Sequence, residues 1–194
     1  MLVLASILVL ASKSPRRQQI LRDAGIPFVV RAADVAEVRR PGESPIDYVR
    51  RLAEEKAFAV PLLPGEVVLG ADTTVVIDEL VLEKPCDAAD ALRMLALLSG
   101  REHQVITGIC LRSETRKIVD TATTRVRFVA LTAEELETYV ASGEPMDKAG
   151  AYAIQGLASK FIDRIEGDYF NVVGLPVALV YHYWREISRQ TATS

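Results

Sequence analysis

The sequence predicts a mixed α/β fold, with a twisted central sheet and flanking helices, and three observations support this prediction. Short apolar runs, such as residues 7–11 and 67–70, are typical of buried strands. Segments with apolar residues at helical spacing, each preceded by a capping residue, lie between these runs. The two kinds of segment alternate along the chain without a linker. We therefore expect sheet and helices to be carried by one domain or by two interleaved lobes.

The first half of the chain contains three helix-start signals. Ser14 is a good N-cap before a proline, Ser44 opens a second helix and Asp87 caps a third. Gly25 and Gly100 are suited to ending the first and third helices. The expected helices cover about residues 15–24, 45–60 and 88–99, and the expected strands cover residues 7–11, 28–31, 67–70 and 74–77, the last as a continuation or a partner of the strand before it.

The second half begins with two long strands, roughly residues 103–112 and 117–129, and the polar turn between them predicts a hairpin. A capping box of Thr132 and Glu135 starts a helix that Gly143 closes. Short strands are expected near residues 151–154 and 161–165, and a last helix over about residues 176–188.

Composition places the chain among globular proteins and limits its partners. With 49% hydrophobic and 25% charged residues, the 194-residue chain has enough apolar surface for a large core. The net charge of −3 argues against a protein that coats nucleic acid but allows a small anionic ligand held by a local cluster of Lys and Arg. Two cysteines, Cys86 and Cys110, are too few for a disulfide framework and fit a reduced, cytoplasmic setting. We expect Cys110 to be buried, Cys86 to be exposed, and His103 and His182 to be structural.

The N-terminal residues 1–12 contain the sequence LVLAS twice. We interpret the second copy as the first core strand and the first copy, about six residues, as an extension or a misplaced start. A signal peptide is the alternative, but the segment lacks a basic n-region. No segment reaches the roughly 20 apolar residues that span a membrane.

The turn from Ser12 to Arg17 is the first candidate site. Arg16 and Arg17 lie in the first turn of the expected helix, where the helix dipole disfavours cations by some tenths of a kcal/mol each, so an anion nearby is expected. Free N–H groups at a helix N-terminus bind phosphate. The segment predicts a strand–turn–helix that binds phosphate, and solvated surface arginines are the alternative.

Asp72 is the second candidate, in the sequence GADTT at the end of an apolar run. A carboxylate there is costly unless it is paired, bound to metal or reactive. Ligand sites in open α/β sheets also gather where strands end. We therefore interpret Asp72 as a candidate general base or metal ligand, with a turn aspartate that caps local N–H groups as the alternative.

Three further clusters carry polar groups in turns. Lys84 lies in a rigid Glu-Lys-Pro turn, and residues 168–176 join a loop to the last helix. Residues 147–156 form a loop of small residues with Lys148 and Gln155, where glycine permits close approach of a ligand and an amide can read a base edge. Ordinary turn and cap chemistry is the alternative for each cluster.

In their order and content, these segments resemble the Maf family of nucleoside triphosphate pyrophosphatases over nearly the whole chain. The matching segments are LASKSPRRQQIL (10–21), Glu37, YVRRLAEEKA (48–57), GADTTVV (70–76), LEKP (82–85), LSGREHQVITG (98–108), SGEPMDKAGAYAIQG (142–156) and NVVGLP (171–176). The loop DKAGAYAIQG resembles the dTTP/UTP branch of the family rather than the branch acting on 7-methyl-GTP. The N-terminal extension departs from the family pattern.

The resemblance implies a single Maf-like nucleotide pyrophosphatase domain over residues 1–194, of a Maf/ITPase-like fold with an active-site cleft between two lobes. It implies hydrolysis of dTTP, UTP or modified pyrimidine triphosphates to the monophosphate and pyrophosphate, with Mg²⁺ or Mn²⁺ as cofactor. An enzyme of this kind is a house-cleaning enzyme, which removes these triphosphates before polymerases use them. The resemblance also implies a cytoplasmic homodimer without stable nucleic-acid or membrane partners.

Residue by residue, Asp72 matches the proton acceptor of the family, and Glu37 with Asp72 are the best acids for metal contact. Arg16, Thr73 and Gln155 match positions tied to substrate choice. Ser12 and Ser14 are expected to donate to phosphate or to shape the turn. The cationic groups expected to bind phosphate are Arg16, Arg17, Lys56, Lys84 and Lys148.

Two other hypotheses about the function remain open. One is a nucleotide- or nucleic-acid-binding regulator of cell division, because the family name derives from septum formation; steeply salt-dependent binding to DNA or RNA would support it. The other is a pyrophosphatase for non-canonical purines on a related α/β scaffold, which the DKAGAYAIQG loop disfavours.

Overall fold

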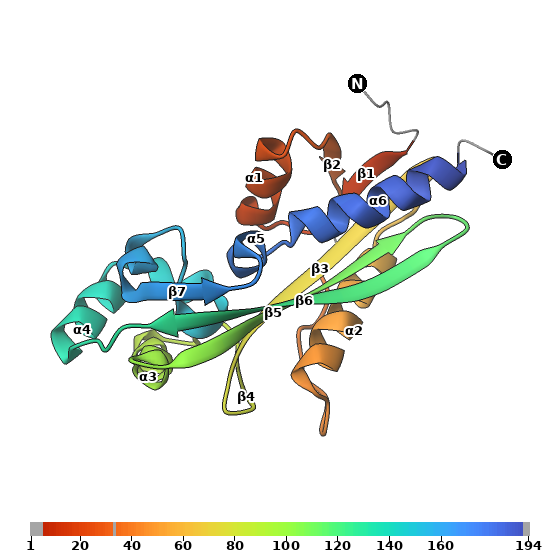
Figure 1. The fold of residues 1–194 in the computed structure, drawn as a ribbon. Helices are drawn as coiled ribbons and strands as arrows, with labels where there is room; N and C mark the ends of the chain where they lie inside the picture. The colour runs from red at the N-terminus through yellow and green to blue at the C-terminus, as the bar shows by residue number, and fades with distance from the viewer. Residues whose placement is uncertain (1–5, 33, 192–194) are drawn as a thin grey trace. The chain divides into compact units, whose positions relative to one another are not determined.

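In the described part of the chain, residues 6–32 and 34–191 of a computed structural model, seven strands form one sheet in the order β2-β1-β3-β5-β6-β7, and β4 pairs with β3 (Figure 1). The residues group into two units that are interleaved along the chain. Unit 1 comprises residues up to 72, 107–122 and 174 onwards, and unit 2 comprises residues 73–106 and 123–173. The mixed α/β class predicted from the sequence is confirmed, whereas a single domain over 1–194 and the cleft between lobes stay predictions. The first copy of LVLAS lies largely in residues 1–5, outside the described residues.

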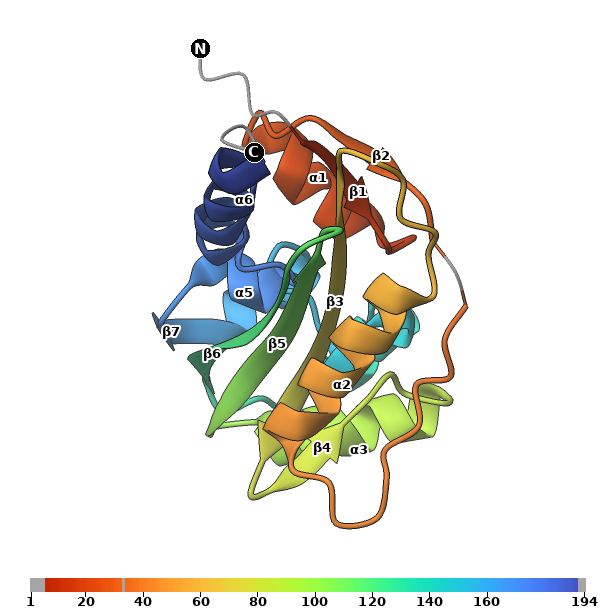
Figure 2. The same cartoon turned by 90° about the vertical axis from the view of Figure 1, so that its right-hand side faces the viewer.

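In unit 1, β1 (Ile7–Leu10) pairs in parallel with β2 (Phe28–Val30) and with the first part of β3 (Glu66–Ile77). Helix α1 (Pro15–Asp23) connects β1 to β2, and α2 (Pro45–Phe58) precedes β3, as parallel neighbours require. Figure 2 shows α2 running along β3. Helix α6 (Val177–Thr191) completes the unit, and the hairpin of β5 (Glu102–Arg112) and β6 (Lys117–Phe128) turns within it.

Four predicted helix starts are confirmed by their caps. The side chains of Ser14, Ser44 and Asp87 each accept a hydrogen bond from the backbone N–H three residues on. Thr132 and Glu135 form the reciprocal capping box of α4 (Ala133–Ala141). These contacts are local in sequence, so the pattern of residues was enough to predict them.

Two glycines let α2 approach the sheet closely. A Cβ at Gly70 of β3 would stand 2.1 Å from the carbonyl oxygen of Ala53, and a Cβ at Gly108 of β5 would stand 2.3 Å from that of Val49. Side chains of a strand alternate between faces, so Val68, Gly70 and Asp72 share one face of β3. The small core between this face and α2 consists of Val9, Ala11, Ala53, Ala57, Val60, Val68 and Cys110.

In unit 2, β4 (Leu80–Leu82) pairs antiparallel with β3, and β7 (Ile162–Glu166) pairs antiparallel with β6. Helix α3 (Ala88–Leu98) packs against α4 and against short 3₁₀ helices. The core of this unit is aromatic at its centre, where Phe128 is in edge contact with Tyr152 and packs near Phe161. The short 3₁₀ helices are η1 (Glu144–Asp147), η2 (Ala149–Ala151) and η3 (Leu157–Phe161), and α5 (Tyr169–Val173) leads toward α6.

The structure corrects two expectations and adds two short elements that the sequence did not predict. The strand expected near residues 151–154 is wrong, because Gly150 and Ala151 have φ of 69° and 60°, left-handed values that end η2 and exclude an extended strand. Residues 67–70 and 74–77 belong to one continuous strand, so Asp72 lies within β3 rather than at a strand end. The two added elements are helix α5 and strand β4, which are too short to show the hydrophobic periodicity on which a prediction depends.

Candidate active site

Helix α2 and strand β3 bring Lys56 and Asp72 together in unit 1. Lys56 lies in the last turn of α2, and its Nζ is 2.6 Å from Oδ1 of Asp72 and 2.5 Å from Oε1 of Glu37. The side chains of Lys56 and Asp72 are 11% and 10% exposed, whereas that of Glu37 is 38% exposed. One ammonium group thus holds two carboxylates, one buried and one open to solvent.

Burial raises the pKa of Asp72, and the charge of Glu37 raises it further. Lys56 and Arg17 act in the opposite direction and lower this pKa. Because burial is the largest effect, Asp72 is a stronger proton acceptor than an ordinary aspartate, which is the shift expected of a general base.

Arg17 is buried in the first turn of α1, where it links two segments of unit 1. Its Nε donates to the carbonyl oxygen of Gly174 at 2.8 Å, and its Nη1 donates to Oγ of Ser12 at 3.2 Å. The same hydroxyl oxygen accepts the backbone N–H of Ser14 at 3.2 Å. Burial lowers the pKa of Arg17, whereas the charges of Asp72 and Glu37 raise it. The positive charge of Arg17 therefore interacts with the same two carboxylates that bind Lys56.

Arg16 is half-buried beside Arg17, and its charge lowers the pKa of Arg17. Two cationic side chains thus occupy the first turn of α1, as the sequence predicted. Of the candidates in unit 1, the structure brings Glu37, Lys56 and Asp72 into direct contact and joins Ser12 to Arg17.

Glu37 and Asp72 offer hard oxygen atoms, the donors that Mg²⁺ and Mn²⁺ prefer. Within residues 6–32 and 34–191 no group of three or more His, Cys, Asp or Glu side chains is arranged to hold a metal ion. Mg²⁺ is commonly bound through one or two carboxylates together with waters and substrate phosphates. The two carboxylates therefore fit a metal that shares its ligands with a bound phosphate.

The other four candidates belong to unit 2. Thr73 is half-buried in β3, directly after Asp72, and Lys84 is exposed after β4. Lys148 donates to the carbonyl oxygen of Glu144 at 2.6 Å and to Oδ1 of Asp147 at 2.5 Å. Gln155 is exposed in a turn. The Lys84 and Lys148 segments meet through the backbone, since Gly150 N–H donates to the carbonyl oxygen of Glu83 at 3.1 Å.

Arg51 of α2 organises the segment around Glu43, a role that the sequence pattern did not predict. Its guanidinium binds Oε1 of Glu43 at 2.6 Å and Glu55 at 3.1 Å, and donates to the carbonyl oxygen of Val38 at 3.0 Å. It lowers the pKa of Glu43 to about 2. The segment that follows Glu37 is thereby fastened to the helix that carries Lys56. The i,i+4 spacing of Arg51 and Glu55 is the sequence feature from which part of this role could have been predicted.

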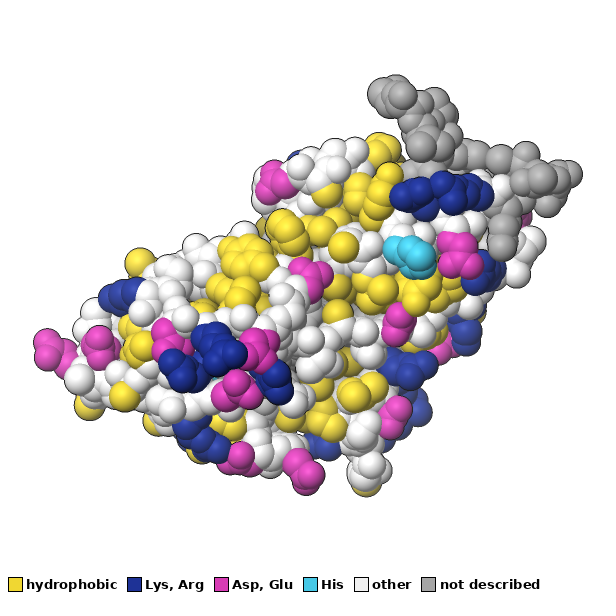
Figure 3. Space-filling view, in the orientation of Figure 1, with side chains coloured by type: hydrophobic (Ala, Val, Ile, Leu, Met, Phe, Trp, Pro, Cys, Tyr) yellow, Lys and Arg dark blue, Asp and Glu magenta, His cyan; other side chains and the backbone are white. Residues whose placement is uncertain are grey.

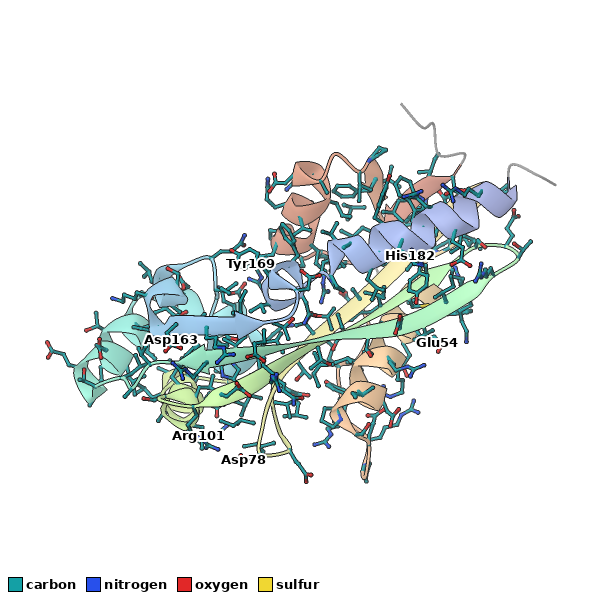
Figure 4. The ribbon with its side chains drawn as sticks, in the orientation of Figure 1. Glu54, Asp78, Arg101, Asp163, Tyr169 and His182 are labelled. Carbon is teal, nitrogen blue, oxygen red and sulfur yellow. The ribbon has the colours of Figure 1, made fainter. Side chains whose placement is uncertain are left out.

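The expected burial of Cys110 and exposure of Cys86 are confirmed, and His103 lies in the core as a structural histidine would. His103 is buried and bonded to Tyr152, while His182 lies exposed on α6 (Figure 4). Cys110 is buried, which raises the pKa of its thiol to about 12, and Cys86 is exposed. None of these groups contacts Glu37, Lys56 or Asp72 through a described hydrogen bond.

Exposed arginines of unit 2 form ion pairs with neighbouring acids. Arg125 pairs with Glu166, and Arg127 pairs with Asp163 at 2.5 Å. Arg101 and Asp78, side by side in Figure 4, form another pair at 2.5 Å. The face shown in Figure 3 accordingly mixes acidic and basic side chains. Such a face differs from the basic stripe that is typical of nucleic-acid-binding proteins. No helix of the described residues combines the length and the apolar character that crossing a membrane requires.

Comparison with known sequences finds relatives that share one name. A dTTP/UTP pyrophosphatase of Koribacter versatilis is 54% identical over 179 residues, which are 92% of this chain and 93% of the relative. A dTTP/UTP pyrophosphatase of Vibrio cholerae is 52% identical over 176 residues, which are 89% of this chain and 93% of the relative. Among solved structures, a HAM1 protein from Coxiella burnetii is 19% identical with a TM-score of 0.42, covering 63% of this chain and 73% of its own; this likeness is too weak to indicate a shared fold.

The family model described as Maf-like protein matches residues 7–187. This range includes every candidate site residue of both units. The chain belongs to the Maf-like protein family.

Proposed function

We propose that this protein hydrolyses dTTP and UTP between the α- and β-phosphates, which yields the nucleoside monophosphate and pyrophosphate. The proposal is supported by relatives of that name at 54% and 52% identity over most of the chain. We include modified pyrimidine triphosphates in the substrate class, because their bases differ from thymine or uracil by few atoms.

The observation that carries the proposal is the buried pair of Lys56 and Asp72, with an Nζ–Oδ1 distance of 2.6 Å. We assign Asp72 as the base that takes a proton from the attacking water. The water oxygen forms a bond to the α-phosphorus, the bond from that phosphorus to the bridging oxygen breaks, and pyrophosphate leaves with that oxygen. Lys56 keeps the carboxylate in place and supplies positive charge beside it.

Cationic groups of unit 1 are suited to phosphate. Arg16 is half-buried at the N-terminus of α1, where backbone N–H groups and the helix dipole add to its charge. We propose that Arg16, Lys56 and the Ser12 turn contact phosphate oxygens, with Arg17 buried beneath them. Lys84 and Lys148 of unit 2 stay proposed phosphate ligands on the resemblance to the family.

Glu37 and Asp72 would hold a divalent cation, Mg²⁺ or Mn²⁺. Such an ion, when bound, offsets the negative charge that develops on phosphate oxygens during the displacement. Lys56 already contacts both carboxylates, so its ammonium group keeps them close together before any metal binds.

For base selection we propose Gln155, together with Thr73 and Arg16. Gln155 is exposed, and its amide offers a donor and an acceptor to the edge of a base. We further propose, on the family resemblance, that the protein is a cytoplasmic homodimer.

The test is pyrophosphate release from a panel of nucleoside triphosphates with Mg²⁺, with Mn²⁺ and with a chelator. We expect release from dTTP and UTP that exceeds release from CTP, ATP and GTP and disappears with the chelator. Absence of metal-dependent release from every pyrimidine triphosphate would rule out the proposed function.

A further inference from the structure

The turn that carries Gln155 is short and closed by its own backbone. Gly156 N–H donates to the carbonyl oxygen of Ala153 at 3.2 Å, and Gln155 is the exposed side chain between them. The side chain of an exposed glutamine has little to hold it, so its position depends on the backbone on which it stands. Contacts on both sides of the turn fix that backbone.

Before the turn, Tyr152 anchors the chain in the core of unit 2. Its hydroxyl is 2.8 Å from Nε2 of His103, and both side chains are buried, at 6% and 2% exposure. The rings of His103, Tyr152 and Phe128 are in mutual edge contact, with centroids 4.9 to 5.4 Å apart. A buried polar pair surrounded by rings allows few alternative positions, because breaking it leaves both groups without a partner.

After the turn, Glu144 fixes the chain from the other side. Its Oε2 accepts the backbone N–H of Leu157 at 3.0 Å, and its Oε1 accepts the hydroxyl of Tyr139 at 2.9 Å. The carboxylate lies against Gly156 so closely that a Cβ there would stand 2.3 Å from Oε1. A side chain at position 156 would therefore displace this carboxylate.

We propose that Tyr152, with its partner His103, and Glu144 are positioning residues for base selection: they hold the turn of residues 153–156 so that the amide of Gln155 is presented in one orientation. The inference rests on the proposed function. None of these three side chains needs to touch the substrate. They act through the backbone to which Gln155 is attached, and their effect is on discrimination between bases rather than on the chemical step.

UTP and CTP are the probes that separate this role from a general structural role. They differ at position 4 of the base, where uracil has a carbonyl oxygen and cytosine an amino group, so a fixed amide distinguishes them and a mobile amide does not. The measured quantity is the ratio of kcat/KM for UTP to kcat/KM for CTP. For Tyr152→Phe we expect this ratio to fall about two- to fivefold, mainly through KM, with kcat for UTP within about threefold of wild type.

The matched control is Tyr183→Phe in unit 1. It also removes one tyrosine hydroxyl from a hydrogen bond, here to Oδ2 of Asp120 at 2.6 Å, and both residues of this bond belong to unit 1. A second pair of variants tests the other anchor. Glu144→Ala removes the acceptor of Leu157 N–H and is expected to lower the ratio, whereas Glu144→Gln keeps an oxygen acceptor and is expected to restore most of it.

Hydrogen exchange of the amide of Leu157 gives a readout that does not depend on activity. We expect faster exchange in Tyr152→Phe and Glu144→Ala than in wild type and Tyr183→Phe. Unchanged ratios in both Tyr152→Phe and Glu144→Ala, in an enzyme that releases pyrophosphate from UTP, would overturn the inference and leave the proposed function standing. Wild type without release from any pyrimidine triphosphate would instead overturn the proposed function, and the inference with it.

Discussion

The candidate residues of unit 1 and those of unit 2 are held by different kinds of contact. In unit 1, Lys56 and Asp72 are charged, nearly buried and joined directly at 2.6 Å. In unit 2, Gln155 is neutral and exposed, and the chain before its turn is held by a buried contact between Tyr152 and His103. The difference matches the two tasks proposed for Asp72 and Gln155. A general base needs an environment that shifts its pKa, and a base-reading amide needs a fixed position in contact with solvent and ligand.

The largest effect is expected for Asp72→Asn. An amide does not accept the proton of the attacking water, so kcat should fall about 10²- to 10⁴-fold, which is the usual contribution of a general base. Asn has nearly the size of Asp, so the fold should remain. The measurement is pyrophosphate release beside thermal unfolding, with the exposed Asp34→Asn as control. Near-normal turnover of Asp72→Asn would remove this residue from the mechanism.

The raised pKa of Asp72 also gives the sign of the pH dependence. The base is active when it is deprotonated, so activity falls on acidification. Because burial raises this pKa, the fall begins at a higher pH than the roughly 3.9 of a free aspartate predicts. The pH dependence of kcat/KM in the wild type measures this pKa. A kcat/KM that falls only below about pH 3.9 would contradict a raised pKa of Asp72.

The next largest effect is expected for Gly70→Ala, because the charged cluster of unit 1 depends on the close approach of α2. The new Cβ would stand 2.1 Å from the carbonyl oxygen of Ala53, so α2 must move away from β3. Overpacking of this kind costs about 1–3 kcal/mol, and we expect about 3 because the contact is with backbone. Displacement of α2 should also separate Lys56 from Asp72 and lower activity.

Gly65→Ala is the comparison for that variant. Gly65 has φ of 77° and open space around it, so alanine there introduces backbone strain without a steric contact. Urea unfolding should show a smaller loss for Gly65→Ala than for Gly70→Ala, with activity retained. Equal losses of stability and activity in the two variants would show that the approach of α2 does not matter.

Acidification is expected to lower the free energy of unfolding through His103, a buried residue of unit 2. This loss begins at a higher pH than the pKa of an ordinary carboxylate. Burial lowers the pKa of His103 to about 4, from about 6.5 in an unfolded chain. Below pH 6.5 the unfolded state therefore binds a proton that the folded state does not, and stability is lost until the folded pKa is reached. The loss amounts to about 2 kcal/mol at pH 5. Asp72, whose pKa is raised, acts in the opposite direction.

The measurement is urea unfolding of the wild type and His103→Gln at pH 7.5 and pH 5. The wild type should lose more stability than the variant between these two values, and the difference isolates His103 from groups common to both proteins. Equal losses would show that His103 is not held neutral by the fold.

These regions also differ in how far the sequence predicts them. Helix starts at Ser14 and Ser44 follow from a capping side chain and its neighbours, so the pattern was sufficient. The residue types of the charged cluster were predicted, but its geometry was not. Asp72 meets Lys56 because both face the narrow space between β3 and α2, and that space depends on glycines in two different strands.

The turn of unit 2 was the least predictable part. The apolar residues around Tyr152 suggested a strand, but Ala151 has φ of 60°, and the following chain bends so that Tyr152 reaches His103, 49 residues earlier. Arg51 was missed for a similar reason. Its i,i+4 pair with Glu55 is an ordinary feature of a helix surface, whereas its contact with Val38 depends on the path of a loop.

The smallest effect is expected for Gln155→Ala, which deletes the exposed amide and leaves the anchors of its turn in place. A net hydrogen bond contributes about 0.5–1.5 kcal/mol, so the preference for UTP over CTP should fall about two- to tenfold. Stability should change little, since the side chain is exposed. Gln19→Ala, which removes an exposed glutamine from α1, is the control. An unchanged substrate profile in Gln155→Ala would exclude base reading by this amide. A changed profile with unchanged stability would show that unit 2 separates the group that selects the base from the groups that keep it in place.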